Sequence, residues 1–300
     1  MNTKSLVHAA MIIAIYLVFL ILYTIGILPS LTALILPIPI IIYSQMSKKL
    51  PEISLLFLGC CIGAFLLTSA FGLFITIIYG LSGLILGWGM VKKWPYWQCI
   101  VNSALVYMFG IPLIIYLISN MWITDLFIEI FTESFEIVNR MMPELSDQIE
   151  IIQNQMTIIL PLIIPTLLLL SGMTLSFLSD RISKLVLHRL KFEVPQTGNI
   201  GRFQLGRMLA IIYIVSPIFV AILNHSVIYI TVLNLMLLLN ILFAFQGTII
   251  LFQLLRTRTK GIITWIILSI LVLYLLFPLS ILGVMDAFFN YRNRFKGKKL

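Results

Sequence analysis

The sequence predicts an all-α protein, a polytopic transmembrane helical bundle of about eight spans, with eight to ten as the range. Three observations predict this class. Of the 300 residues, 61% are hydrophobic and 10% are charged, whereas about a quarter of the residues in soluble domains are charged. Uncharged runs of the roughly 20 residues that cross a bilayer recur along the chain. Basic residues gather in short clusters between these runs, as the positive-inside rule requires.

Composition also limits the partners and the chemistry. The net charge is +9, but no basic stripe is interleaved with aromatic residues, so nucleic acid is not an expected partner and the lipid bilayer is. The three cysteines, Cys60, Cys61 and Cys99, lie in or beside apolar runs and give neither a disulfide framework nor a metal-ligand spacing. We therefore expect no metal ion and no cofactor.

The first two predicted spans are residues 6–26 and 31–43. Lys4 precedes the first run, which is longer than the apolar core of a signal peptide, so we expect it to stay in the protein. The second run is short and contains Pro37 and Pro39. Prolines remove backbone hydrogen bonds, which a membrane tolerates only where protein covers the freed groups. We therefore expect this span to be kinked and enclosed by other helices.

An uncharged block over residues 53–91 predicts a helical hairpin, which supplies spans three and four. The block is bounded by Lys48-Lys49 and by Lys92-Lys93, and it is long enough to cross the membrane, turn near residues 70–72 and return. Both lysine pairs then lie on the cytoplasmic side. Two small-residue motifs of the kind that lets helices approach closely support this packing: Gly59-x-x-x-Gly63 and Gly83-x-x-x-Gly87.

Span five is predicted at residues 96–119, and an acidic segment over residues 121–155 follows it. This segment holds seven of the eleven acidic residues, and its apolar residues recur with the period of a helix. We expect an extracytoplasmic amphipathic helix, ended by Pro143, and then span six at residues 156–177. Residues 1–179 thus form a predicted six-span membrane domain.

The pattern of basic and apolar residues over 180–207 predicts a basic amphipathic linker at the inner surface, with Arg181 and Lys184 on one face. C-terminal transmembrane helices and a basic tail, residues 208–300, follow in three apolar blocks: 208–223, 227–255 and 261–289. A last straight crossing would leave the basic tail outside the cell. We therefore expect the last block to bend back near Pro278 as a re-entrant element, with both termini in the cytoplasm. A nine-span arrangement is the alternative.

The first predicted span carries Ala10-x-x-x-Ala14, a small-residue face suited to another helix. A basic residue before such a span, at the head of a six-span domain, resembles the membrane-embedded substrate-binding subunits, or S components, of energy-coupling-factor vitamin transporters. In that family the alanine face docks on the transmembrane coupling subunit. The resemblance therefore implies a docking role for Ala10 and Ala14. Internal packing also explains such spacing.

A second resemblance covers the whole chain. Residues 283–292 are similar to the C-terminal signature of the YybS family of bacterial membrane proteins, and Gln246-Gly247 resembles another feature of that family. The family is distantly similar to the S components, and it implies a place in a bacterial cell membrane. Phe288 and Asn290 depart from the signature, where tryptophan and aspartate are expected. The residues that carry over form a motif without an assigned role: Gly283, Asp286 and Arg292.

Polar residues inside apolar spans are costly unless they are paired, so they mark either ligand sites or contacts between helices. The candidates for lining a ligand cavity are neutral: Thr68, Asn102, Tyr107, Asn240 and Gln246. Hydrogen bonds between helices explain most residues of this kind. Asp286 likewise has a structural interpretation, in which it pairs with Arg292 or Arg294 and fixes how the last helix leaves the membrane.

These features favour a solute-binding, transporter-like component without enzymatic activity. The sequence has no phosphate-cradling Gly-rich loop and no charged residue in the middle of a span, so transport needs an energising partner. We expect a small hydrophobic or amphiphilic solute in a pocket roofed by the acidic segment. The alternative is a membrane scaffold or regulatory partner whose basic inner surface engages anionic lipid or an intracellular protein. An intramembrane enzyme acting on lipid would require convergent titratable residues, which the sequence does not offer.

Overall fold

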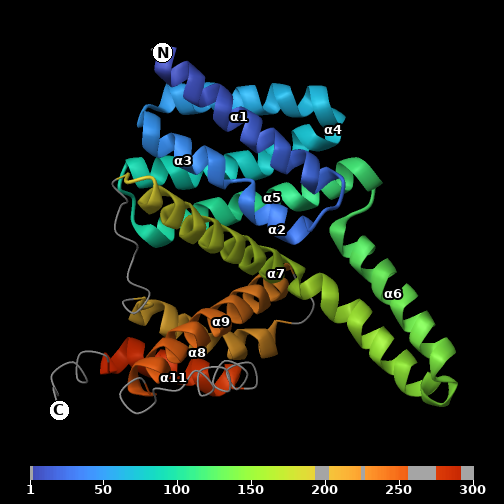
Figure 1. The fold of residues 1–300 in the computed structure, drawn as a ribbon. Helices are drawn as coiled ribbons and strands as arrows, with labels where there is room; N and C mark the ends of the chain where they lie inside the picture. Colours follow the sequence, from blue (N-terminus) through green and yellow to red (C-terminus); the bar gives the residue numbers. More distant parts are fainter. Residues whose placement is uncertain (1–2, 193–202, 224–226, 256–274, 292–300) are drawn as a thin grey trace. The chain divides into compact units, whose positions relative to one another are not determined.

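The computed structural model of the chain (Figure 1) describes these residues: 3–192, 203–223, 227–255 and 275–291. All regular secondary structure in this part of the chain is helical. The chain divides into two compact units, Met1–Thr197 (unit 1) and Gly198–Leu300 (unit 2), and each unit has a hydrophobic core of its own. The division lies within residues 180–207, which the sequence marks as a linker.

Unit 1 consists of helices connected by short turns: α1 (Thr3–Thr24), α2 (Pro29–Ile35), α3 (Ile38–Ser47), α4 (Leu50–Val91), α5 (Tyr96–Ser119), α6 (Ile123–Met141), the 3-10 helix η1 (Pro143–Leu145) and α7 (Ser146–Arg189). The described helices of unit 2 are fewer: α8 (Arg207–Ile222), α9 (Val227–Leu255) and α11 (Leu276–Phe289). Six stretches of the described residues are long and apolar enough to cross a membrane: α1, α2 with α3, α4, α5, α7 and α9. These stretches confirm the predicted class, a polytopic bundle of membrane helices.

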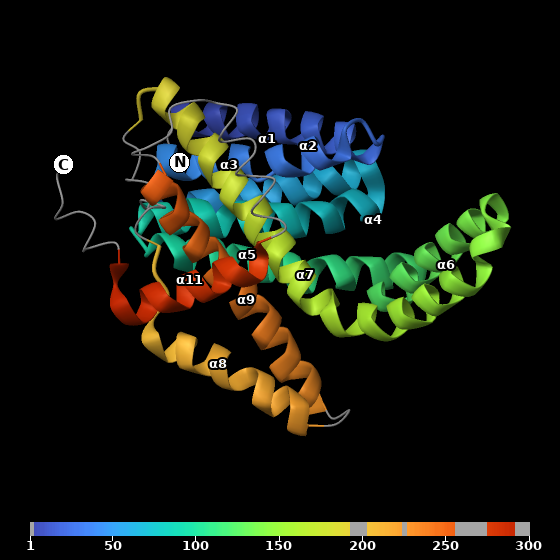
Figure 2. The same cartoon turned by 90° about the horizontal axis from the view of Figure 1, so that it is seen from below.

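Helix α4 is a hairpin of two antiparallel arms rather than one straight rod. At Ser69 the backbone has φ 61° and ψ −161°, far from helical values, and the chain reverses there. A Cβ on Gly80 would lie 2.6 Å from the ring of Phe57, although a straight helix would hold these residues roughly 35 Å apart. The two arms run side by side (Figure 1, Figure 2). The predicted hairpin is confirmed, with its turn next to the expected residues 70–72.

The glycines of the two small-residue motifs hold the neighbours of α4 close. In the first arm, a Cβ on Gly59 would lie 2.7 Å from the side chain of Ile13 in α1. In the second arm, a Cβ on Gly83 would lie 2.7 Å from the carbonyl oxygen of Pro37, which belongs to the backbone at the start of α3. Glycine lets side chains and backbone approach without a Cβ in the way, so the motifs act in packing, as predicted.

The second span breaks into two short helices, α2 and α3, at Leu36 and Pro37. Pro37 is the N-cap residue of α3 and Pro39 lies in its first turn, where a missing N–H breaks no helical hydrogen bond. In the most apolar part of this span 61% of the residues are buried, against 17–28% in the other candidate spans. The span is therefore kinked and enclosed by other helices, as predicted.

The acidic segment forms a helical hairpin that extends beyond the other helices of unit 1 (Figure 1). Helix α6 ends at Met141, Pro143 opens the turn η1, and α7 then begins at Ser146. Helix α7 has 44 residues, which gives about 66 Å at 1.5 Å per residue, twice the thickness of a hydrocarbon core. Its first half packs beside α6 (Figure 2). The predicted amphipathic helix and its end before Pro143 are confirmed.

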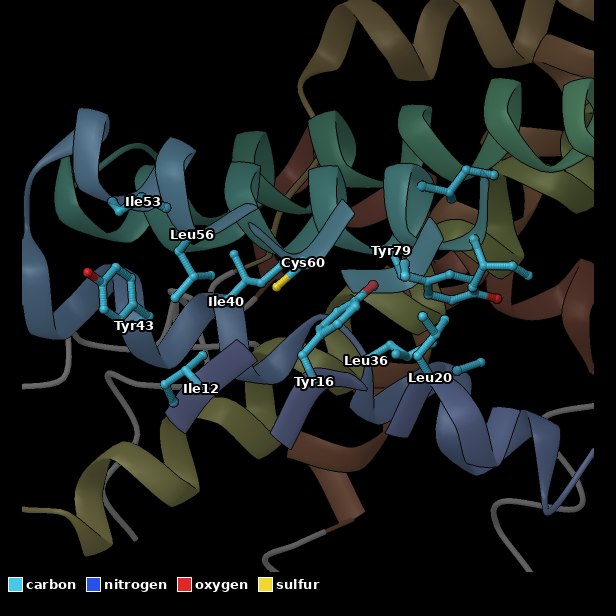
Figure 3. Close-up of a cluster of buried hydrophobic side chains, with 14 of the residues drawn as sticks. Ile12, Tyr16, Leu20, Leu36, Ile40, Tyr43, Ile53, Leu56, Cys60 and Tyr79 are labelled. Carbon is cyan, nitrogen blue, oxygen red and sulfur yellow. The ribbon is translucent and has the colours of Figure 1, made fainter. Parts of the chain in front are cut away.

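The core of unit 1 is a row of apolar side chains, most of them from α1, α3 and α4 and one, Tyr107, from α5 (Figure 3). The row includes three fully buried tyrosine rings, Tyr16, Tyr43 and Tyr107. It also contains Tyr79, and many of its other members are aliphatic or carry sulfur: Ile12, Leu20, Leu36, Ile40, Ile53, Leu56 and Cys60. Tyr43 lies at the same end of the row as Ile53, and the hydroxyl-bearing edge of its ring faces away from the centre (Figure 3).

The two lysine pairs that bound α4 lie at one end of unit 1. Gln45, near the end of α3, donates from Nε2 to the carbonyl oxygen of Gly87, near the end of α4, at 3.0 Å. Ser5, at the start of α1, donates from Oγ to Glu52, at the start of α4, at 2.9 Å. The end where these helix termini meet is called the basic end, and it carries four exposed lysines: Lys48, Lys49, Lys92 and Lys93.

Unit 2 packs α9 against α11 and α8. Its core is formed by buried side chains of these three helices: Ala210, Leu239, Phe243, Val284 and Ala287. Helix α11 has 14 residues, about 21 Å, which is shorter than a membrane crossing. Pro278 lies in the first turn of α11. The last apolar block would approach its expected bend over residues 256–274, and these lie outside the described residues. The bend therefore stays a prediction.

Candidate functional site

A pocket of about 280 Å³ opens at the basic end of unit 1. Its lining comes from the start of α1, the end of α3 and the start of α4: Ser5, His8, Tyr43, Met46, Ser47, Lys49 and Glu52. We call it the basic-end pocket. Nearly every lining residue carries a polar group, although the helices around it are almost entirely apolar. Such a pocket, concave and with a few convergent polar groups, is the usual form of a small-molecule site.

Local structure explains why Glu52 faces this pocket. Lys48 adopts a left-handed conformation, with φ 56°, and turns the chain from α3 into α4. Pro51 and Glu52 then occupy the first turn of α4. A proline there breaks no hydrogen bond, and the helix dipole favours a negative charge at this end. The short connection between the helices thus holds the Glu52 carboxylate between α1 and α3.

The Glu52 carboxylate is held by hydroxyl groups from two other helices. Ser5 in α1 and Ser47 in α3 each donate from Oγ to Oε2 of Glu52, at 2.9 Å in both cases. The second oxygen, Oε1, lies 3.7 Å from Nζ of Lys49. The Tyr43 hydroxyl is 3.4 Å from Ser5 Oγ. Hydrogen bonds to a charged group are stronger than neutral ones, so the carboxylate is fixed in place on one side and faces the pocket.

A second, larger pocket of about 680 Å³ adjoins the first. It shares Lys49 and Glu52 with the basic-end pocket, and its other lining residues are apolar or aromatic: Leu50, Pro51, Leu55 and Trp88. We call it the apolar groove. The ammonium of Lys92 lies 5.0 Å from the centre of the Trp88 ring. Polar and apolar surface therefore meet at Lys49 and Glu52.

A buried hydroxyl network joins three helices in the interior of unit 1. Ser82 in the second arm of α4 donates to Tyr107 of α5 at 2.8 Å and lies 2.8 Å from Ser103 of the same helix. Ser176 of α7 donates to Ser103 at 2.8 Å. All four side chains are fully buried. Each such bond contributes on the order of 1 kcal/mol in a membrane, so the network ties α4, α5 and α7 together.

A buried ion pair lies on the last turns of α7, where the sequence predicts a basic surface. Nζ of Lys184 is 2.9 Å from Oδ2 of Asp180, and both side chains are almost fully buried. The guanidinium of Arg181 lies over the rings of Phe177 and Tyr96, at 5.1 and 5.9 Å. The prediction that Lys184 belongs to the exposed basic face is therefore wrong. The spacing of four residues brings the ammonium onto Asp180, which offsets the cost of burying it.

In unit 2, the predicted ligand-lining residue Gln246 meets the predicted motif residue Asp286. Gln246 is fully buried in α9, and its Nε2 donates to Oδ2 of Asp286 at 2.9 Å and to the carbonyl oxygen of Gly283 at 3.1 Å. Its Oε1 accepts from the backbone N–H of Leu205 at 2.8 Å. All the hydrogen-bonding groups of this amide face protein, so Gln246 connects α9, α11 and the residues before α8.

Two glycines beside this amide bring α9 and α11 into backbone contact. A Cβ added to Gly283 would overlap the carbonyl oxygen of Phe243, and one added to Gly247 would overlap the carbonyl oxygen of Leu279. The family motif therefore forms the contact between two helices. Its third residue, Arg292, lies outside the described residues, as does Arg294, so the predicted pairing of Asp286 with either arginine stays a prediction.

The other sequence-predicted residues belong to both units. Thr68 donates to the carbonyl oxygen of Ala64 near the turn of α4, at 2.7 Å, and Asn102 is half-buried in α5. Asn240 of α9 donates to the Tyr213 hydroxyl at 2.8 Å. None of the predicted lining residues lines either of the two pockets described above.

Ala10 and Ala14 are exposed on α1. The opposite face of this helix is buried in unit 1: Ala9, Ile12, Tyr16 and Leu20. The two alanines therefore lie on the exposed face of α1, and their predicted docking role stays a prediction.

Sequence reasoning missed the basic-end pocket, although one signal pointed to it. Glu52 is the only acidic residue before Asp125, and it lies between a lysine pair and a long uncharged block. A lone carboxylate at the boundary of a membrane span needs partners. Those partners, Ser5 and Ser47, are ordinary serines in the sequence, and only the packing of three helices brings them to Glu52.

Comparisons with known proteins agree with the membrane fold. A family model described as "Predicted membrane protein (DUF2232)" matches residues 12–287. The chain is 23% identical over 317 residues to the protein of Bacillus subtilis (strain 168) named "Uncharacterized protein YybS", and the alignment covers 98% of this chain and 99% of that protein. No solved structure matches the chain. The resemblance to the YybS family is confirmed, and the likeness to S components rests on the sequence pattern alone.

Proposed function

Because the chain belongs to the DUF2232 family of predicted membrane proteins, we propose that it is a membrane-embedded binding component that holds a small amphiphilic solute in the basic-end pocket. The sequence pattern places the solute under the acidic segment, but the two pockets described above lie at the opposite end of unit 1. We therefore move the site to the basic end, which the positive-inside rule assigns to the cytoplasm.

The observation that carries this proposal is the fixed carboxylate of Glu52. Its side chain is only 16% exposed, and two hydroxyls from other helices orient it toward the pocket. Burying a charge is costly, and a purely structural site would do better with an apolar residue. A fixed, partly buried charge beside an empty volume is suited to recognising a ligand of opposite charge.

The role is one of binding, and movement of the solute depends on a partner. Six stretches of the described residues are long and apolar enough to cross a membrane, and the sequence contains no nucleotide-binding loop. The exposed face of α1 around Ala10 and Ala14 is the docking surface that the S-component resemblance implies. A transmembrane coupling subunit on this face would supply the energy.

A scaffold or regulatory role is the second candidate. The exposed lysines of the basic end and the exposed Arg189 at the end of α7 form a cationic surface suited to anionic lipid or an acidic intracellular protein. This role needs the surface charge but not the fixed carboxylate. Removing the charge of Glu52 would leave such a function intact, which separates the two candidates.

Native mass spectrometry of the gently extracted protein tests the proposal. We expect the wild-type protein to retain a small molecule and Glu52→Gln to lose it, with occupancy reduced at least about tenfold, because a charge-assisted hydrogen bond is removed. Glu129→Gln, which removes an acidic side chain on α6 far along the chain from the pocket, is the control. Equal occupancy in Glu52→Gln and the wild type would contradict the proposal.

A further inference from the structure

We infer that the basic-end pocket and the apolar groove together bind a phospholipid with a primary amine in its headgroup. This inference rests on the proposed function and names the chemical class of the solute. Three features of one continuous site carry it: an anionic acceptor for the amine, cations for the phosphate, and an apolar channel for the acyl chain.

Glu52 supplies the acceptor for the amine. Its Oε2 accepts two serine hydroxyls, whereas its Oε1 has Lys49 Nζ at 3.7 Å, which is beyond hydrogen-bond distance. A carboxylate accepts about four hydrogen bonds and an ammonium donates three. Oε1 therefore has capacity for a ligand N–H. A trimethylammonium group has no N–H to donate, so the site distinguishes ethanolamine from choline headgroups.

Two lysines supply the charge for the phosphate. The side chain of Lys49 is 72% exposed and lies at the boundary between the pocket and the groove. Lys92 lies over the ring of Trp88, which also lines the groove. In the inferred complex the phosphodiester lies in the groove beside these cations. The site thus offers both an anion for the amine and cations for the phosphate of a zwitterionic headgroup.

The apolar groove supplies the place for an acyl chain. Leu50 and Leu55 are exposed along it, by 38% and 55%, and Trp88 lines its wall. The groove begins where charged residues give way to the uncharged arm of α4, and tryptophan is typical of the boundary between headgroups and hydrocarbon. A soluble metabolite would leave this surface empty, whereas a lipid fills the pocket and the groove together.

Titration of the purified, delipidated full-length protein with lipids of identical acyl chains tests the inference by native mass spectrometry. We expect phosphatidylethanolamine to bind at least about tenfold more tightly than phosphatidylcholine, the ratio expected for one charge-assisted hydrogen bond. Glu52→Gln removes this preference, and Lys49→Gln weakens the binding of both lipids. Lys93→Gln, an exposed lysine outside both pockets, changes neither.

A second pair of variants tests the groove without disturbing the carboxylate. Leu55→Asn lowers the affinity for phosphatidylethanolamine at least about tenfold, whereas Leu58→Asn leaves this affinity unchanged. Both leucines are 55% exposed on the same arm of α4, but only Leu55 lines the groove. Free phosphoethanolamine binds more weakly than the lipid and does not distinguish the two variants. Equally strong binding of free phosphoethanolamine would overturn the lipid assignment.

The outcomes also separate this inference from the proposed function. Equal affinities for the ethanolamine and choline lipids, with both lowered by Glu52→Gln, would overturn the amine class and leave a solute site at Glu52. Lipid binding that is independent of Glu52, together with no retained molecule in the wild type, would overturn both. The melting temperature of each variant shows whether a loss of binding comes from unfolding. If Glu52→Gln unfolds, the Leu55 and Lys49 variants decide the inference.

Discussion

Gly283→Ala is expected to destabilise unit 2 by about 3 kcal/mol or more. The added Cβ would overlap the carbonyl oxygen of Phe243, which belongs to the backbone of α9 and cannot rotate away as a side chain can. Overpacking in a close-packed interior typically costs about 1–3 kcal/mol, and more where a backbone has to move. Separating α11 from α9 also stretches the hydrogen bonds of Gln246 to Gly283 and Asp286.

The matched control for this variant is Gly206→Ala. Gly206 precedes α8 in the same unit and has nothing within 4 Å of the position that a Cβ would take. Thermal denaturation of the detergent-solubilised protein, with limited proteolysis to locate the change within residues 203–291, gives the comparison. We expect Gly247→Ala to behave like Gly283→Ala, because it meets the backbone of Leu279. If Gly283→Ala had the same melting temperature as Gly206→Ala, α9 and α11 would not be in backbone contact.

Lys184→Met is expected to destabilise unit 1 by about 3–5 kcal/mol, the usual cost of leaving a buried charge without its partner. The substitution keeps the length of the side chain but leaves the carboxylate of Asp180, which is 2% exposed, without the ammonium at 2.9 Å. The double variant Asp180→Asn with Lys184→Met should recover most of the loss, since neither charge then remains. Melting temperature and the yield of monodisperse protein report the effect.

The control for the buried pair is an exposed pair with the same spacing. Glu136 and Arg140 lie 3.6 Å apart on α6, with side chains 61% and 80% exposed. Exposed pairs contribute at most about 1 kcal/mol, so Arg140→Met should change stability little. A Lys184→Met variant as stable as Arg140→Met, or a double variant worse than the single one, would show that the Asp180 carboxylate does not depend on Lys184.

The helices of unit 1 follow from the sequence because a bilayer leaves few solutions. Some forty uncharged residues bounded by lysine pairs have to cross twice if both pairs stay on one side, and α4 does reverse at Ser69. Pro143 follows the end of α6 because a proline interrupts a helix, and the prolines of the second span set the break between α2 and α3. In each case, residues close in sequence determine the structure.

The sites depend on contacts between residues far apart in sequence, which a pattern within one helix does not show. The partners of Glu52 come from α1 and α3, and Gln246 reaches Asp286 on another helix. The pattern of charges also misplaced Lys184, because the positive-inside rule predicts the side of the membrane but not whether a cation is paired and buried. Hydrogen bonds between helices, the commoner explanation for polar residues in spans, account for Tyr107 and Gln246 as the structure shows them.

The central claim is that α4 crosses the membrane twice, so that the pocket around Glu52 and both lysine pairs face the cytoplasm. Single cysteines at Lys49, Lys93 and Ser69, introduced after replacement of Cys60, Cys61 and Cys99, test it in intact cells with a membrane-impermeant thiol reagent. The account predicts that the cysteine at position 69 reacts from outside, and that those at positions 49 and 93 react only after the membrane is opened. Labelling of positions 49 and 93 from opposite sides would contradict it.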